Sequence, residues 1–446
     1  MAPSPEFVNN FTIRYAPFIN PQAPDTSIRS FLKLVPPQQR NGLKMQYPVQ
    51  AAFSHGQTVT PNGTIGNLNA ARSGVDMMAE IDATNLYMRD QLPYDALMRG
   101  GNGASKEGSA PAYWKPIDKL VKNLQTGMEY YTELALLFGP GTGATIVDDI
   151  GVVATTPVAG GSATTYGGGT GPVVQLTKAS WAAGMWNLAG DGGNTGSGML
   201  VDVLNSAGTA VLETNVRIIA VQDPSLCQVK MIGTTPGSTT VAAGQRFLPA
   251  GWYQNQSIGL GGILKNTATF AGISAAANPF WRARGYNAGG ALTAAKMLIA
   301  LAKMHAVGVR GGLVGFVHAL QFSDLVNETT SLTRWNAKDD GTTGDVKVFG
   351  SEKIEFMSAV GPVTLVNHLY AKQGEAMFLP KKESVRIGAC DITMKGVDDG
   401  RIILEIPNQT GSEVRSMAQQ APLIKVPAHA LRVFGITPTG EDTSGS

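Results

Sequence analysis

The chain has 446 residues, of which 15% are charged and 43% hydrophobic, and its 35 basic and 33 acidic side chains leave a formal charge of +2. This composition predicts a globular protein of two to four domains, at roughly 100 to 200 residues per domain. The near balance of charge argues against a strongly basic nucleic-acid binder and against an acidic disordered tail. The two cysteines, Cys227 and Cys390, do not suit a disulfide scaffold and favour a reducing compartment.

The sequence carries no pattern that predicts secretion or membrane insertion. Its first residues, MAPSPEFVNN, lack a basic patch followed by an apolar run, so a cleaved signal peptide is not expected. The most apolar stretch, residues 291–320, is interrupted by Lys296, Lys303, His305 and Arg310, whereas a membrane span needs about 20 mostly apolar residues in a row. We therefore expect a protein that is made and kept in the cytosol, with no membrane partner.

Residues 1–40 are predicted to form an extended N-terminal arm. They contain seven prolines, and their apolar residues show neither helical nor alternating spacing. Phe and Tyr gain free energy only by docking on a surface, so an arm with several aromatic residues is not a free linker. The candidate contact residues of this arm are Phe11, Tyr15 and Phe18.

Residues 41–92 are predicted to form an extended loop built on a long two-stranded hairpin. Strand-like residues 42–53 and 75–81 flank Pro61-Asn62-Gly63, a turn signal in which Asn-Gly tolerates positive φ. Two-stranded ribbons are marginal in water, so the hairpin should lie against something else, and its candidate intersubunit residues are Lys44, Tyr47, Asn62, Gly63, Met77 and Met78. Core filling is the alternative for the two methionines.

The clearest helix spans residues 116–138. Apolar residues recur in it at three- and four-residue spacing, Pro116 suits a first turn, and Gly139-Pro140 cannot continue the helix. We expect Leu120, Leu124, Tyr131 and Phe138 to pack on the body. The residues available for the solvated face are Asp118, Lys119, Lys122, Glu129 and Glu133.

Residues 146–274 are predicted to form a β-rich insertion. Short strand-like runs at 199–204, 216–221, 227–232 and 245–248 are separated by turn signals, which favours a small β-sandwich or barrel. The loops 205–208 and 236–237 should be tolerant surface turns.

A second helix is expected at residues 291–306, followed by mixed strands and short helices up to residue 436. The apolar face expected for this helix consists of Leu292, Ala295, Leu298, Ile299 and Ala302.

No spacing typical of a catalytic, metal or cofactor site is present. The sequence lacks a phosphate-binding Gly-Lys-Ser/Thr loop, a Gly-x-Ser-x-Gly elbow and a His-Glu-x-x-His motif. The carboxylate pairs Asp148-Asp149 and Asp398-Asp399 lie in Gly-rich loops, where solvated turn residues are the expected explanation. The five histidines are dispersed. We therefore expect no enzyme activity, no metal and no cofactor.

Three segments resemble major capsid proteins of tailed bacteriophages with the HK97-type fold: KASWAAGMW at 178–186, LKNTATFAGISAAANPFW at 264–281, and GPVTLVNHLYAKQGEAMFL at 361–379. The resemblance implies an α+β, HK97-like capsid fold with an N-arm at 1–40, an extended β-hairpin loop at 41–92 and a peripheral domain with the spine helix at 93–145. It implies a β-rich insertion domain at 146–274, a peripheral helix at 275–309, an axial domain at 310–400, and peripheral return strands with a tail at 401–446.

The resemblance also implies a structural role. Subunits would assemble as hexamers and pentamers into an icosahedral head that encloses double-stranded DNA, in a virion capsid assembled in the host cytoplasm. A separate scaffolding protein, a portal, and a decoration or cement protein would be partners, and packaged DNA would be contacted weakly and non-specifically. Some family members crosslink a lysine of the extended loop to a neighbour's asparagine, but Lys44 lies at the base of the loop, so that chemistry is not carried over.

Two alternatives from other classes remain open. An encapsulin-like compartment shell shares this fold, although its chains are typically shorter and lack a large β insertion. A Gly/Thr-rich β binding module, such as an adhesin, would suit the turn-rich segment but predicts a signal peptide.

Overall fold

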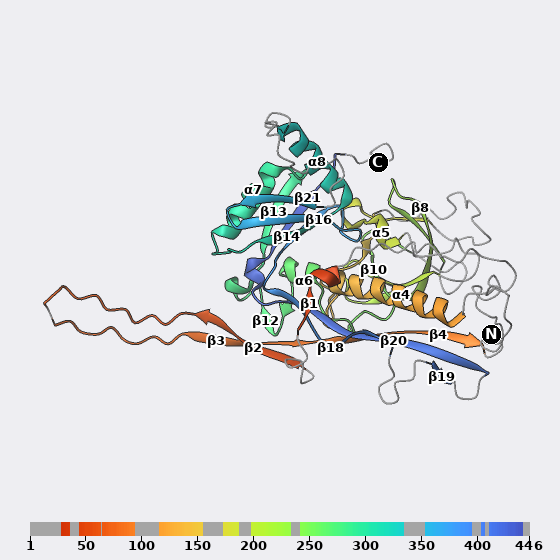
Figure 1. The fold of residues 1–446 in the computed structure, drawn as a ribbon, viewed down its shortest axis with the longest axis horizontal. Coiled ribbons are helices and arrows are strands. Elements are labelled where there is room, and N and C mark those ends of the chain that lie inside the picture. The colour runs from red at the N-terminus through yellow and green to blue at the C-terminus, as the bar shows by residue number, and fades with distance from the viewer. Residues whose placement is uncertain are drawn as a thin grey trace, which may run out of the picture.

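The structure, a computed structural model, describes residues 28–35, 44–63, 65–93, 116–154, 173–186, 198–232, 241–333, 353–394, 403–405 and 410–439. Within these ranges the chain forms three larger β-sheets, helices packed beside them, and one hairpin that projects far from the body (Figure 1). The structure is thus mixed α and β, as expected, and it contains more strand than helix. The arm residues Phe11, Tyr15 and Phe18 lie outside the described residues.

The described part of the arm is docked on the body. It forms a short helix, α2 (Ile28–Phe31), and a two-residue strand, β1 (Lys33–Leu34). Ile28 and Leu32 are fully buried, and Lys33 pairs in parallel register with Val385. Residues 28–35 therefore belong to the fold of their own subunit.

The hairpin consists of β2 (Lys44–Ala52) and β3 (Val75–Asp82), paired antiparallel from Lys44↔Asp82 outwards. The expected hairpin is therefore confirmed. The expected loop reached residue 92, but β4 (Thr84–Pro93) leaves the hairpin and pairs with β20 (Gly411–Ile424) in the body.

The sheet at the base of the hairpin, called the β20 sheet, combines distant parts of the chain. Its order is β1-β18-β20-β19, with β4 also paired to β20; β18 spans Ser384–Thr393 and β19 spans Ile403–Glu405. Residues 384–393 were expected in an axial domain, but β18 pairs with β20 of the expected peripheral return strands. Hydrogen-bond pairing between β18 and β20, and not their order along the chain, places these two strands in one sheet.

The long helix α4 (Pro116–Phe138) has the bounds that the sequence predicted, and it packs against β4 and β20 (Figure 1). Leu120, Leu124 and Phe138 are buried as expected, and Tyr131 is partly buried. Glu133, expected on the solvated face, is instead buried at 4% exposure. The reason is that the loop before β17, which carries His368, covers this part of the helix.

The β-rich segment contains one six-stranded sheet, called the β8 sheet, in the order β5-β10-β7-β8-β9-β6. Its strands are β5 (Gly151–Val152), β6 (Val173–Gln175), β7 (Met199–Leu204), β8 (Val211–Asp223), β9 (Gln228–Ile232) and β10 (Arg246–Pro249). The two ends of this order also pair with each other: Val153, after β5, bridges Leu176, after β6, and the Ala154 amide donates to the Gln175 carbonyl at 2.8 Å. The sheet therefore closes on itself as a small barrel, one of the two forms expected from the sequence.

Val201 and Val216 of this sheet belong to the same apolar core as Leu136 of α4. One contact between the two lies at Met199 of β7, whose sulfur is 3.5 Å from the Tyr130 hydroxyl of α4.

Short elements connect the β8 sheet to the rest of the body. They are η3 (Lys178–Ser180), α5 (Ala183–Trp186), α6 (Leu260–Lys265), β11 (Thr269–Phe270), β12 (Ile273–Ser274) and η4 (Pro279–Trp281). Two of the segments that carry the family resemblance fall here, and their tryptophans Trp181, Trp186 and Trp281 are each about 1% exposed. Both segments therefore contribute to the main apolar core of this chain.

The third sheet, called the β14 sheet, has the order β13-β21-β17-β14-β16-β15. Its strands are β13 (Arg284–Gly290), β14 (Leu313–Val317), β15 (Lys353–Ser358), β16 (Gly361–Asn367), β17 (Glu375–Pro380) and β21 (Leu431–Ile436), with η5 (Pro427–His429) leading into β21. β13 and β21 were expected in the peripheral domain, yet they pair with each other and β21 pairs with β17.

Helices α7 (Ala294–His305) and α8 (Ala319–Thr333) accompany the β14 sheet. The buried face of α7 consists of Met297, Ala300, Leu301 and Met304. Of the apolar face predicted from the sequence, Leu292 is buried, but Leu298 and Ile299 are 47% and 53% exposed. The predicted face was therefore wrong for the helix itself. Apolar residues lie on more than one face of this helix, so their spacing alone is compatible with two buried faces. Packing against β13 and β21 determines which face is buried. No helix among the described residues is long and apolar enough to cross a membrane.

Candidate functional site

The hairpin has one face towards the body and one towards solvent near its base. Tyr47 and Met77 pack against the main core, and Ala79 beside them is fully buried. Met78 points the other way and is 60% exposed. Because side chains alternate along a strand, the two neighbouring methionines have different surroundings. The sequence proposed both as contact residues, and the structure leaves Met78 on the open face.

Tyr47 shows how closely the base of the hairpin is held. Its hydroxyl is buried with no hydrogen-bond partner among the described residues, and burial raises the pKa of this phenol well above its ordinary value. It lies directly across from Ala79 in the strand register. Tyr47 therefore supports the hairpin on its own subunit.

Lys44 lies at the base of the hairpin, as expected. Its Nζ forms an ion pair with Oε1 of Glu80 at 2.5 Å, and the Gln46 amide donates to the other oxygen of the same carboxylate at 2.7 Å. The Glu80 partner raises the pKa of the ammonium group. Lys44 is thus engaged within its own hairpin.

Beyond the two strands the chain continues as a projecting tip, residues 53–74. His55 and Arg72 exchange backbone hydrogen bonds at 2.9 and 3.1 Å, and Asn69 donates from its side chain to the Gln57 carbonyl. The turn at Asn62-Gly63 is exposed, and Gly63 has φ +83°, a conformation that glycine adopts without a steric penalty. At about 3.3 Å per residue, ten residues carry this turn up to about 33 Å past the strands.

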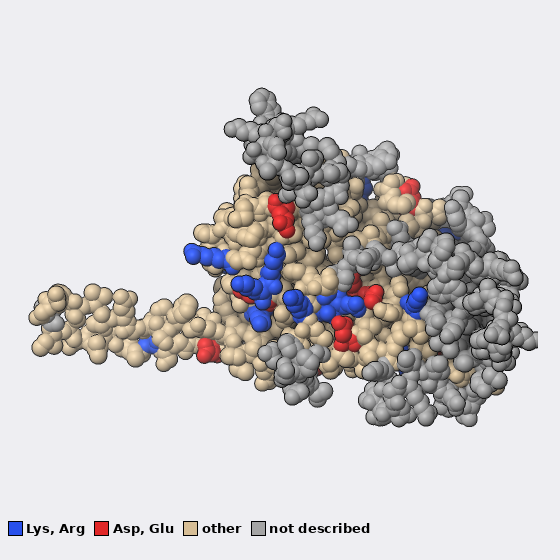
Figure 2. Space-filling view, viewed as in Figure 1, with Lys and Arg blue, Asp and Glu red and all other residues tan. Residues whose placement is uncertain are grey.

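The tip exposes large apolar residues and has Arg72 as its one Lys, Arg, Asp or Glu residue. Four large hydrophobic residues on it are open to solvent: Phe53 at 71%, Val59 at 83%, Ile65 at 105% and Leu68 at 87% exposure. Residues 45–71 contain no Asp, Glu, Lys or Arg. In Figure 2 the outer end of the hairpin shows no Lys, Arg, Asp or Glu side chain. Such a surface is costly in water and is typical of a contact site.

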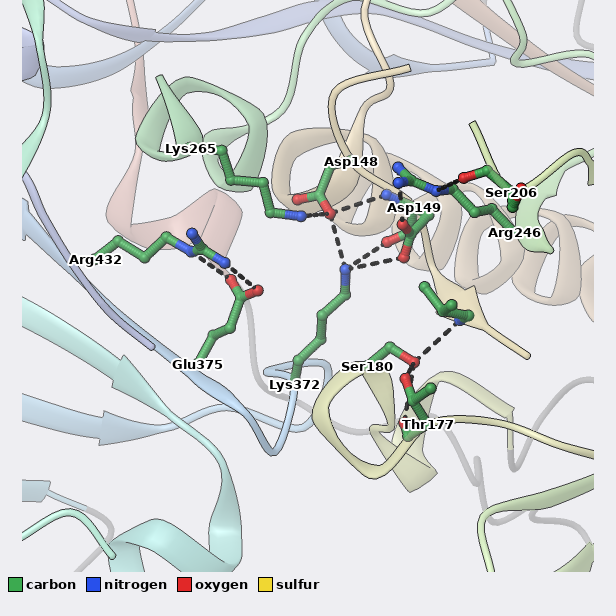
Figure 3. A network of polar contacts seen from close by, with 11 residues as sticks. Asp148, Asp149, Thr177, Ser180, Ser206, Arg246, Lys265, Lys372, Glu375 and Arg432 are labelled. Atoms are coloured by element: carbon green, nitrogen blue, oxygen red, sulfur yellow. Dashed lines mark hydrogen bonds and ion pairs between the residues drawn. The ribbon is translucent and has the colours of Figure 1, made fainter. Parts of the chain in front are cut away.

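The sequence analysis missed a second cluster, which lies inside the body. Asp148 and Asp149, expected as solvated turn residues, are 1% and 4% exposed. Asp148 Oδ1 accepts from Nζ of Lys265 at 2.6 Å and from Nζ of Lys372 at 2.8 Å (Figure 3). The Asp149 backbone carbonyl also accepts from Lys372, at 2.6 Å. The expectation was wrong because it considered only neighbours in the sequence.

The charges in this cluster hold one another in the ionised state. Burial by itself raises the pKa of Asp148, but the ammonium groups of Lys265 and Lys372 outweigh burial and hold the pKa below its ordinary value. Burial likewise acts to lower the pKa of Lys372, and the two aspartates raise it on balance. Position 261, next to Asp148, requires glycine, because a Cβ atom there would lie 2.0 Å from Asp148 Oδ2.

Further ion pairs extend the cluster. Glu375, in the QGEA motif, makes two hydrogen bonds to the Arg432 guanidinium at 2.6 and 2.9 Å, and Arg246 lies 3.8 Å from Asp149 (Figure 3). Together these residues connect α6, β10, β17, β21 and the segment after α4. Each carboxylate faces a fixed cation, so the arrangement fastens elements together and leaves no unpaired base for proton transfer.

The buried histidines do not form a metal site. His318 and His368 are 8% and 2% exposed, and burial lowers the pKa of each to about 4. His368 Nε2 lies 3.7 Å from the Glu133 carboxylate, and its Nδ1 accepts from the Tyr370 amide. In the described part of the chain, no three His, Cys, Asp or Glu residues are placed to hold a metal ion. Asp398-Asp399 lies outside that part.

Comparisons with known proteins give information about the fold. No protein-family model and no curated protein matches the sequence. A chain of the capsid asymmetric unit of cyanophage A-1(L) aligns over 96% of this chain and 96% of its own, with 13% identity and a TM-score of 0.51. A chain of Mycobacterium phage Bobi aligns over 95% of both chains, with 9% identity and a TM-score of 0.43. A chain of the holo-SrpI encapsulin complex from Synechococcus elongatus PCC 7942 aligns over 99% of both chains, with 10% identity and a TM-score of 0.41.

At these identities the likeness concerns the fold alone. Of these three chains, the cyanophage chain is the one with a TM-score above 0.5. The protein therefore shares the fold of a bacteriophage capsid chain. This is the fold that the resemblance to HK97-type capsid proteins predicted.

Proposed function

We propose that this chain is a structural major capsid protein, whose copies assemble through the hairpin tip and the N-terminal arm into a closed shell. The observation that carries the proposal is the outer hairpin: residues 45–71 contain no Asp, Glu, Lys or Arg, and the tip exposes Phe53, Val59, Ile65 and Leu68. A lone chain gains nothing from exposing these residues, whereas a neighbouring copy would bury them. The shared fold with a capsid chain supports the same role.

The finer assignments belong to the same proposal. Hexamers and pentamers of the chain would form an icosahedral head around double-stranded DNA in the virion, assembled in the host cytoplasm with a scaffolding protein, a portal and a decoration protein. The chain would act as a building block and not as an enzyme, which agrees with a buried cluster whose carboxylates are all paired with cations. Exposed Asn62, Gly63 and Met78 would lie in or beside the intersubunit contact.

Electron microscopy of the expressed full-length chain, alone and with the neighbouring gene products, tests the proposal. We expect closed particles or capsomers from the wild type and unassembled, folded subunits from Leu68→Asp, because an aspartate cannot be buried at a neighbour's surface without a partner. Leu212→Asp is the matched control: Leu212 is 56% exposed on β8, outside the hairpin. Normal particles from Leu68→Asp would remove the role of the tip, and monomers under all conditions would remove the capsid assignment.

A further inference from the structure

Five exposed basic side chains lie where strands of the β20 and β14 sheets end, beside the base of the hairpin. They are Lys33, Arg282, Lys381, Lys382 and Lys425, called here the basic surface. Figure 2 shows Lys and Arg side chains gathered on the visible face of the body near the hairpin. The five residues come from four separate parts of the sequence, so only the fold brings them together.

Strand register places these residues close to one another. Lys381 and Lys382 form the turn between β17 and β18, and Lys33 of β1 pairs with Val385, just inside β18. On the other side of β18, the Lys425 amide donates to the Glu383 carbonyl at 3.0 Å. Adjacent strands are about 4.8 Å apart, so this group spans roughly two strand spacings. Arg282 adjoins it because η4 contacts η5, which begins two residues after Lys425.

The acidic residues nearby leave most of this charge uncompensated. Glu383 accepts from Nδ1 of His429 at 2.8 Å, and Glu355 accepts weakly from Thr364, which in turn accepts from Lys381. No described carboxylate forms an ion pair with Lys33, Lys382 or Lys425. The Arg282 guanidinium is held by the Ala275 and Ala276 carbonyls, which fix its position without cancelling its charge.

The basic surface also lacks an apolar anchor. The large exposed hydrophobic residues of the described chain lie on the hairpin, β4, β7, β8, α7 and β15, and none lies in the segments that carry the five cations. A protein partner normally binds through a buried apolar or aromatic anchor, whereas a phosphate backbone needs only positive charge spread along its path. This difference favours duplex DNA over an acidic protein segment.

We propose that the basic surface is the part of the subunit that contacts the phosphate backbone of duplex DNA, without regard to sequence. The inference rests on the proposed capsid function and adds to it the residues that face the enclosed nucleic acid. With at most five cations the contact is weak and sensitive to salt: a slope of about −0.9 per phosphate gives at most about −4.5, or a loss of roughly 500-fold in affinity between 50 and 200 mM salt. Such binding would neutralise DNA without holding it tightly.

Fluorescence anisotropy with a 30-base-pair duplex and the unassembled full-length chain measures this slope. We expect Lys382→Gln combined with Lys425→Gln to reduce the slope by about 2 and to weaken binding at low salt. The matched control, Arg72→Gln combined with Arg89→Gln, removes two exposed positive charges on the hairpin and on β4 and should leave the slope near its wild-type value. Thermal unfolding of each variant confirms that it is folded.

Other outcomes overturn the inference. Equal slopes for the wild type and the Lys382/Lys425 variant would remove the basic surface as the DNA contact. Binding of polyglutamate but not of duplex DNA, dependent on the same two lysines, would assign the surface to an acidic protein instead. Microscopy of the same variant separates this inference from the proposed function: normal particles with lost DNA binding support both, whereas a wild type that never assembles removes the capsid function only.

Discussion

Lys372 donates from Nζ to Asp148 Oδ1 at 2.8 Å, a contact between residues 224 positions apart in the chain. One residue lies in the loop between β16 and β17, and the other follows the long helix α4. Both side chains are almost fully buried, at 4% and 1% exposure. This ion pair, shared with Lys265, fastens the loop before β17 of the β14 sheet to the segment after α4, where the β-rich segment begins.

Removing the shared carboxylate should destabilise the subunit strongly. Asp148→Asn removes the carboxylate that pairs with partly buried Lys265 and leaves buried Lys372 with Asp149 as its described ion-pair partner. Breaking a buried ion pair costs about 3 to 5 kcal/mol. Urea unfolding of the unassembled chain measures the effect. Asp76→Asn, on the exposed face of the hairpin, is the control and should change stability by less than about 0.5 kcal/mol. Equal stability of the two variants would contradict the role given to Asp148.

The same carboxylate predicts a loss of stability in acid. Its pKa is lower in the folded chain than the ordinary value of 3.8, so its contribution is complete above about pH 4 and is lost as the pH falls further. Asp148→Asn should therefore show a smaller fall in unfolding free energy below pH 4 than the wild type, measured by urea titration at each pH.

The buried histidines should affect the folding stability at higher pH than Asp148 does. Burial lowers the pKa of His368 from 6.5 to about 4, so the unfolded chain binds more protons than the folded chain between these values. Stability present above pH 6.5 is therefore lost as the pH falls to 4. His368→Gln should make this decline shallower, leaving His318 to account for much of the rest, whereas His55→Gln on the exposed hairpin should not. An unchanged pH profile for His368→Gln would show that Glu133 compensates the imidazolium.

The packing of α4 predicts which of its positions tolerate charge. Leu124 is 4% exposed, so Leu124→Asp buries an unpaired carboxylate and should cost several kcal/mol, enough to prevent folding. Asn123→Asp adds the same charge at the neighbouring exposed position and should leave a folded subunit. Circular dichroism and soluble yield measure the difference. A folded, assembling Leu124→Asp variant would mean that this helix is not packed as described.

The turn at residues 205–208 was expected to tolerate change, but it contacts the segment after α4. The Gly208 carbonyl accepts from the Ile146 amide at 3.0 Å, and a Cβ on Gly208 would lie 2.5 Å from Ile146 Cγ1. Gly208 has φ +70°, so Gly208→Ala combines backbone strain with this clash. We expect it to lower Tm more than Gly251→Ala, since Gly251 has φ +78° with nothing within 4 Å and suffers the strain alone. Equal Tm values for the two variants would contradict the close contact between position 208 and Ile146. The other loop, 236–237, lies outside the described residues.

Local patterns were sufficient to predict several elements. The proline at the start of α4, its apolar spacing and the Gly-Pro after it predict residues 116–138, which are the bounds of the helix. The Asn-Gly turn between two strand-like runs predicts the hairpin. Both depend on interactions between near neighbours, namely helical turns and a tight turn, so the sequence around them carries the information.

The candidate site was predicted only in part, and the difference follows from strand alternation and long-range packing. Asn62, Gly63 and Met78 are exposed on the hairpin, whereas Tyr47 and Met77 pack on the subunit's own core. The exposed apolar residues Ile65 and Leu68 were missed, although the uncharged run 45–71 is visible in the sequence. Which side of a strand packs on the body depends on the surface that the strand meets. The sequence of the strand alone carries no information about that surface.

By itself the sequence determined the elements with short-range causes: the hairpin, the long helix, the strands of the β-rich segment and the capsid-like segments around Trp181 and Trp281. Tertiary structure decided everything that depends on partners far along the chain. It buries Asp148 and Asp149 between two lysines, places β18 beside β20, and selects the Met297 face of α7 over the Leu298 face. The physical reason is that burial and ion pairing depend on the residues that cover a surface. Here those residues come from other segments of the chain, up to 224 positions away in the case of Asp148 and Lys372.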